Sequence, residues 1–123
     1  MDFKRTLIFA AIITLIDIPW IRYVMFPQYK GVFDIKMKPE AAFVAYTCMI
    51  ICYPLIISKF TTLKEQIMIA ATIGLVIYGT YGFTLAAIYD KYPMNLAIIE
   101  TLWGTTLFTI STFLTYKAGK YLE

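Results

Sequence analysis

The chain has 123 residues, 60% of them hydrophobic, and its mean hydropathy is +0.70. A soluble domain of this length would expose much of that apolar surface to water, whereas a bilayer needs only about 20 apolar residues for each spanning helix. The net charge of +3 is small, and the basic residues form no stripe interleaved with aromatic residues outside the apolar segments. The composition therefore indicates a membrane protein and argues against nucleic-acid binding.

The first apolar segment, residues 6–26, follows a short charged head. It is long enough to span a bilayer and has no small-x-small cleavage site, so we expect a retained transmembrane helix and not a secretory signal. Asp17 lies near its middle, where a charge is costly. Pro19 lacks a backbone donor and predicts a kink that packs against other protein.

Three more apolar segments follow, separated by polar stretches, of which the longest, residues 27–40, is expected to be an extramembrane loop. The remaining helices are predicted at residues 39–58, 66–89 and 94–116. The expected fold class is all-α: an integral membrane protein with four transmembrane helices in an up-down bundle with short loops. We expect residues 1–123 to form one domain.

Small residues in the last two predicted helices are placed for close helix approach. Gly74, Gly79 and Gly82 lie in the third helix and Gly104 in the fourth. Small residues let the backbones of transmembrane helices approach one another. Together with Pro19, these glycines are the candidate helix-packing positions.

Four spans place both termini on one side of the membrane. Six Lys and Arg residues lie on the terminal side and five on the other. When Arg22 is discounted as a side chain that extends to the interface from within a helix, the balance favours cytoplasmic termini.

Two acids inside apolar segments are the candidate site. Asp17 precedes Trp20 by three positions, and Glu100 precedes Trp103 by three, so each acid shares a helical face with an aromatic donor. If helices one and four pack together, the acids become a pair that shares a proton, because two buried carboxylates repel. The alternative is that each acid accepts hydrogen bonds and fixes helix packing. A salt bridge from Arg22 to either acid stays open.

Other chemistry has little support in the sequence. No histidine is present, which removes the usual general base and the commonest metal ligand. Cys48 and Cys52 share one helical face but have no further ligands beside them, so we expect buried apolar cysteines. We expect no enzymatic activity, no cofactor and no metal.

Three short motifs carry a family resemblance. They are Asp17-Ile18-Pro19-Trp20, Tyr81-Gly82-Phe83-Thr84-Leu85 and Glu100-Thr101-Leu102-Trp103-Gly104. The chain resembles an uncharacterised family of small four-helix membrane proteins, domain of unknown function twenty-one seventy-seven. That family's pattern is Asp-x-x-Trp, Tyr-Asp-x-Thr-Asn and Asp-x-x-Trp-Gly. Here Gly82 and Leu85 replace the expected Asp and Asn, so the resemblance implies the fold more than a shared chemistry.

The favoured function is a structural or assembly subunit, in a lipid membrane or a larger membrane complex. The alternative is an oligomeric proton, ion or small-solute channel or transporter that uses the intramembrane carboxylates. The expected partners are membrane lipid and either further copies of the chain or other subunits.

Overall fold

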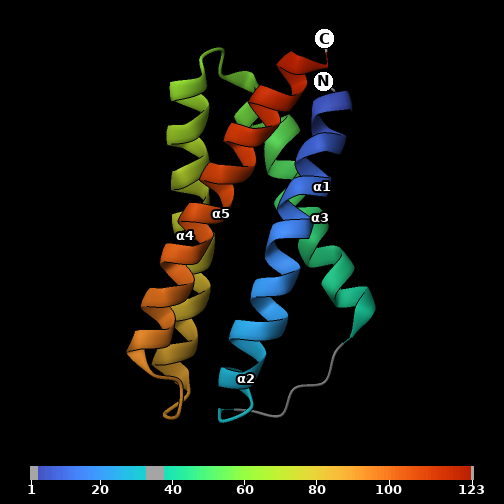
Figure 1. The fold of residues 1–123 in the computed structure, drawn as a ribbon. Coiled ribbons are helices and arrows are strands. Elements are labelled where there is room, and N and C mark those ends of the chain that lie inside the picture. The colour runs from blue at the N-terminus through green and yellow to red at the C-terminus, as the bar shows by residue number, and fades with distance from the viewer. Residues whose placement is uncertain (1–2, 33–37, 123) are drawn as a thin grey trace.

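The computed structural model describes residues 3–32 and 38–122, and this part of the chain is a bundle of helices joined by short turns (Figure 1). Its elements in chain order are α1 (Phe3–Trp20), the π-helical turn η1 (Ile21–Met25), α2 (Phe26–Tyr29), α3 (Pro39–Leu55), the 3-10 turn η2 (Ile57–Lys59), α4 (Leu63–Ile88) and α5 (Met94–Tyr121). Four continuous stretches are long and apolar enough to cross a bilayer: Phe3–Tyr29, Pro39–Lys59, Leu63–Ile88 and Met94–Tyr121. The predicted all-α membrane fold with four spans is confirmed.

The helices extend further than predicted at several ends. Helix α4 begins at Leu63 because Thr62 caps it: the Glu65 amide donates to Thr62 Oγ1 at 3.2 Å, and the Thr62 hydroxyl donates to Glu65 Oε1 at 2.8 Å. Helix α5 continues to Tyr121 instead of ending near residue 116. The first span continues through Tyr29, so the predicted loop starts later, and its residues 33–37 lie outside the described residues.

Pro19 is followed by a change of helical register. Immediately after it the chain forms η1, and the Phe26 amide donates to the Ile21 carbonyl, five residues back. Such π-type turns are a known way for a helix to absorb a local disturbance. Pro19 itself is exposed, so within this chain the kink does not pack against another helix.

Helices α5 and α1 are central to the bundle. Helix α5 packs most extensively against α4 and also against α1, and α1 in turn packs against α3. Figure 1 shows both termini at one end, where Lys4 Nζ donates to the Leu122 carbonyl at 2.8 Å. Helix α3 diverges from α1 toward its Pro39 end (Figure 1). The bundle is therefore tight along α4, α5 and α1 and more open beside α3.

Glycines set the distance between α4 and α5. A Cβ on Gly74 would lie 2.2 Å from the Gly104 carbonyl oxygen, and a Cβ on Gly104 would lie 2.2 Å from the Tyr78 ring. At Gly82 the added atom would meet Ala97 at 3.3 Å, whereas Gly79 has ordinary room. Close backbone packing of this kind stabilises the helix pair through dispersion contacts. These contacts matter in a bilayer because the hydrophobic effect does not drive helices together in lipid.

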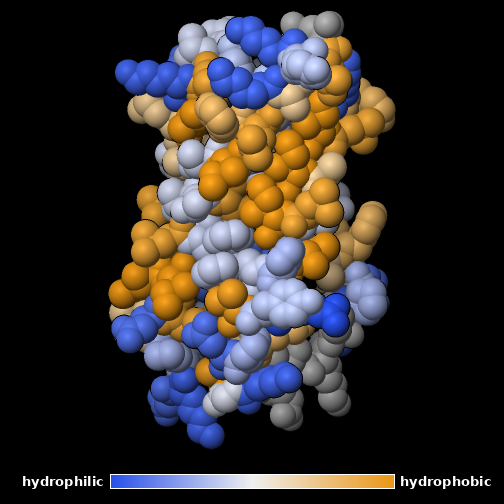
Figure 2. Space-filling model, in the orientation of Figure 1, coloured by the Kyte–Doolittle hydropathy of each residue, from blue (hydrophilic) through white to orange (hydrophobic). Residues whose placement is uncertain are grey.

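Apolar side chains are distributed as a bilayer requires. One core cluster lies toward the termini and contains Phe9, Ile13 and Phe108; a second lies toward the α4–α5 turn and contains Met25 and Leu96. Figure 2 shows hydrophobic surface around the middle of the molecule and hydrophilic residues at both ends. The exposed apolar surface is thus the surface that lipid tails cover.

Candidate functional site

Asp17 connects three helices. It lies on α1, is 1% exposed, and uses both carboxylate oxygens as acceptors. The indole Nε1 of Trp103 on α5 donates to Oδ1 at 2.9 Å, and the hydroxyl of Tyr46 on α3 donates to Oδ2 at 2.8 Å. The cost of placing a carboxylate in the membrane is therefore reduced by two hydrogen bonds that join α1 to α5 and α3.

Glu100 has a similar environment nearer the opposite end of the bundle from the termini. It lies on α5, is 4% exposed, and accepts hydrogen bonds from Tyr29 on Oε1 and from Tyr92 on Oε2, the latter at 2.9 Å. Tyr29 ends α2 and Tyr92 lies in the α4–α5 turn. Burial, the nearby charge of Glu100 and the hydrogen bond to Glu100 raise the pKa of the Tyr92 hydroxyl. This hydroxyl therefore stays protonated and serves as a hydrogen-bond donor to the carboxylate.

Every one of the four carboxylate oxygens thus accepts a hydrogen bond from an aromatic side chain. Each acid has its own donors, and no hydrogen bond joins Asp17 to Glu100. The two carboxyls do not meet as the shared-proton hypothesis requires. Neither carboxylate forms a salt bridge with a described basic residue: Arg22 is exposed, and its guanidinium carbon lies 5.9 Å from the centroid of the Tyr23 ring.

The two tryptophans lie against each other between the acids. The rings of Trp20 and Trp103 are stacked, with centroids 4.3 Å apart and planes inclined by 4°. Trp103 donates to Asp17 on the other helix instead of to Glu100 one turn away, and Trp20 Nε1 is buried without a hydrogen-bond partner. The expected pairing of each acid with the tryptophan on its own helix is therefore wrong, because stacking turns both indoles across the α1–α5 interface.

Three of the four donors were not identified from the sequence. These three donors are Tyr29, Tyr46 and Tyr92. Their hydroxyls reach the acids only through tertiary packing: Tyr46 lies 29 positions from its acceptor and Tyr29 lies 71 positions from its own. A buried acid requires donors, and tyrosines in or beside the spans are the available signal.

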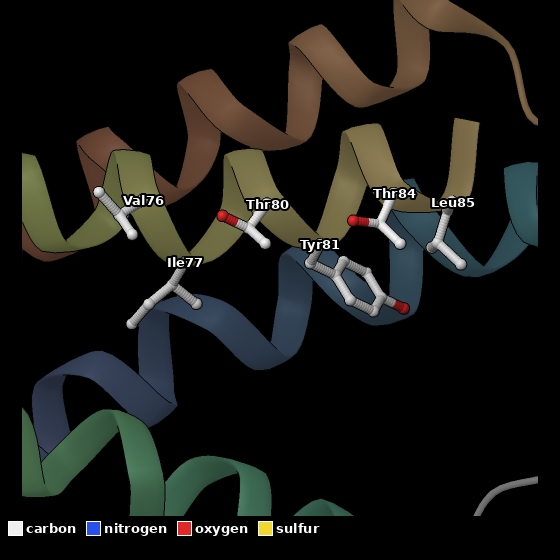
Figure 3. A pocket seen from close by; sticks show the side chains of 6 residues that line it. All are labelled: Val76, Ile77, Thr80, Tyr81, Thr84 and Leu85. Carbon is white, nitrogen blue, oxygen red and sulfur yellow. The ribbon is translucent and has the colours of Figure 1, made fainter. Parts of the chain in front are cut away.

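The central motif segment borders an open groove on α4. The groove has a volume of about 430 Å³, and Figure 3 shows its six lining side chains, Val76, Ile77, Thr80, Tyr81, Thr84 and Leu85. The Tyr81 hydroxyl lies beside that of Tyr29, which donates to Glu100. Gly82 faces away, against Ala97 of α5. A side chain at position 82 would press on Ala97, so glycine suits this helix contact.

The remaining candidates are peripheral to the acids. Cys48 is exposed and Cys52 is half-buried, so the expectation of two buried cysteines is wrong. Both are free thiols, and Cys52 donates to the Cys48 carbonyl at 3.4 Å. Gly74, Gly82 and Gly104 lie in the α4–α5 contact already described.

Comparison with known proteins gives one match. Residues 3–117 match the family model described as predicted membrane protein, DUF2177. No curated protein and no solved structure matches the chain. The match covers all four spans and both buried acids, and the chain therefore belongs to the DUF2177 family of membrane proteins.

Proposed function

We propose that this protein is a non-catalytic structural or assembly subunit of a membrane or of a larger membrane complex. One observation carries the proposal: each oxygen of the two buried carboxylates accepts a hydrogen bond from an aromatic side chain on another segment. The acids therefore act as cross-links between α1, α2, α3, α5 and the α4–α5 turn.

Occupation of every carboxylate oxygen by an aromatic donor favours a packing role. Trp103 can only donate, which fixes Oδ1 of Asp17 as an acceptor, and rotation of that carboxyl would break two hydrogen bonds at once. A group that binds and releases a transported proton must instead gain and lose partners easily. Hydrogen bonds between membrane helices contribute about 0.6 kcal/mol on average, so four of them stabilise the bundle measurably.

Substitution of Asp17 tests this role directly. In Asp17→Asn the amide oxygen still accepts from Trp103, and the amide nitrogen donates to the Tyr46 hydroxyl. We expect this variant to keep a thermal unfolding midpoint close to that of the wild type in detergent. Asp17→Leu leaves both donors buried without acceptors, and we expect a loss of about 1–3 kcal/mol in the free energy of unfolding.

Flux measurements separate the subunit role from transport. We expect purified wild-type protein in liposomes to show no proton or cation flux across a pH gradient. Flux that is lost in Asp17→Asn or Glu100→Gln would overturn the proposal, because both substitutions keep hydrogen bonding and remove only the titratable group.

The groove on α4 favours a second candidate, an oligomeric channel or transporter. Its exposed lining is mainly apolar, but it lies within a membrane span and includes Tyr81, whose hydroxyl lies beside that of Tyr29, a donor to Glu100. Polar side chains inside a span often mark a pathway for protons or solutes. This candidate requires Glu100→Gln to abolish flux that the wild type shows. Phe83→Leu is a matched control, since Phe83 lies in the same part of α4 but does not line the groove.

The proposed partners are membrane lipid and either further copies of the chain or other subunits, with no nucleic acid. We also infer cytoplasmic termini from the excess of basic residues at that end. Chemical cross-linking in the native membrane measures the assembly. Accessibility of a cysteine added after Glu123 to a membrane-impermeant reagent measures the orientation.

A further inference from the structure

Three buried polar atoms in the half of the bundle that contains the termini have no hydrogen-bond partner within the described residues. They are Oε1 of Gln66 on α4 and the hydroxyl oxygens of Ser111 and Thr112 on α5. Gln66 is 5% exposed, and both residues on α5 are 0% exposed. Buried polar groups in native proteins are almost always hydrogen-bonded, to protein or to ordered water.

The packing of α4 against α5 brings these atoms to the same level. The two helices run antiparallel (Figure 1), and a Cβ on Gly74 would press on the Gly104 carbonyl. Four residues further along each helix, Ala70 and Phe108 belong to one buried core cluster. Another four residues in the same direction lead to Gln66 on α4 and to the two hydroxyls on α5.

The side-chain amide of Gln66 has a fixed orientation. Its Nε2 donates to the Phe60 carbonyl at 2.8 Å. If the nitrogen and oxygen of the amide exchanged places, Oε1 would face that carbonyl oxygen, and two acceptors repel. Oε1 is therefore an acceptor, and because it is buried its donor must lie inside the bundle.

The two unpaired hydroxyls differ from the other hydroxyls of α5. Every other threonine of this helix donates to the backbone carbonyl four residues earlier: Thr101, Thr105, Thr106, Thr109 and Thr115. Such a bond within the helix is common for hydroxyl side chains in membrane spans. Ser111 and Thr112 form no such bond in the described structure, so both hydroxyls can bind a partner outside their own helix.

We propose that one water molecule is bound between α4 and α5, where it donates to Gln66 Oε1 and accepts from the hydroxyls of Ser111 and Thr112. A buried water typically makes about three hydrogen bonds to groups that are otherwise unpaired, and this site offers one acceptor and two donors. A cation suits the site less well, because the two hydroxyl hydrogens would still lack acceptors. The water joins the start of α4 to α5, beyond the level at which the glycines hold the two backbones together.

A crystal structure of the full chain, at a resolution that shows ordered water, tests the site directly. We expect a density peak about 2.8 Å from Gln66 Oε1 and from both hydroxyl oxygens. A direct hydrogen bond between Gln66 and either hydroxyl, or no peak at this position, overturns the proposal. A peak about 2.4 Å from the three oxygens would be a bound cation and would also overturn it.

Removal of one hydroxyl gives an independent test, because the sign of the change in stability is informative. Thr112→Val keeps the shape of the side chain but cannot bind water. If water holds this hydroxyl, the thermal unfolding midpoint in detergent should fall by about 4 °C through loss of a hydrogen bond. If the hydroxyl is dry and unpaired, valine removes a costly buried group and the midpoint should rise.

Thr115→Val is the matched control on the same helix. Thr115 is also 0% exposed, but its hydroxyl donates to the Ser111 carbonyl at 2.7 Å and needs no water. We expect the control to change the midpoint by less than about 2 °C, since a bond of this kind adds little to helix stability. A fall in Thr112→Val no larger than that of the control overturns the proposal.

Discussion

The contact between Gly74 and Gly104 makes the strongest prediction about stability. In Gly74→Ala the new methyl group would lie 2.2 Å from the Gly104 carbonyl oxygen, 2.7 Å from its carbon and 3.0 Å from Thr105 Cα. All three are backbone atoms, which cannot rotate away. Helices α4 and α5 must therefore separate by about 1 Å to restore a normal contact of about 3.5 Å.

Separation also weakens neighbouring contacts, including that of Gly82 with Ala97. Overpacking of this kind costs about 1–3 kcal/mol. For a chain of this length that corresponds to a fall of about 4–12 °C in the unfolding midpoint. Circular dichroism at 222 nm during heating in detergent measures the shift.

Gly79→Ala is the matched control on the same helix. Its methyl group would meet only the Thr101 side chain, at 3.6 Å, while alanine favours helix over glycine by about 1 kcal/mol. We expect Gly79→Ala to be as stable as the wild type or more so. If Gly74→Ala is as stable as Gly79→Ala, the close α4–α5 approach is refuted.

Three further changes probe the acid site and the cap of α4. Tyr46→Phe removes one donor to the buried aspartate and should cost about 0.6–1.7 kcal/mol. Tyr121→Phe, at an 87% exposed position, should cost almost nothing, and chemical denaturation measures both. The stacked rings of Trp20 and Trp103 should give an exciton couplet in near-ultraviolet circular dichroism. The chain has only two tryptophans, so Trp20→Phe should abolish that couplet. A Trp20→Phe spectrum identical to that of the wild type would contradict the stack. Thr62→Ala should lower the free energy of unfolding by about 1 kcal/mol, and unchanged stability would show that the cap contributes nothing.

The spans were predictable from the sequence because hydropathy over about 20 residues depends only on local composition. The start of α4 could also be predicted, since Thr62 and Glu65 have the spacing of a capping box. The hydrogen bonds of the acids were not predictable in this way. A helical face shows which residues lie together, but not which neighbouring helix they meet: Trp103 and its acceptor Asp17 are 86 positions apart.

The long separation between Asp17 and its donors has a consequence for membrane insertion. Helix α1 is synthesised first, and its carboxylate reaches the membrane before Trp103 has been made. Tyr46 becomes available when α3 arrives, but Trp103 comes with the last helix. Until then Oδ1 of Asp17 lacks its hydrogen-bond donor in or beside the lipid. This cost favours retention of α1 at the insertion machinery. The arrival of α5 therefore completes assembly of the whole bundle, and truncation before α5 should leave a chain that cell quality control removes.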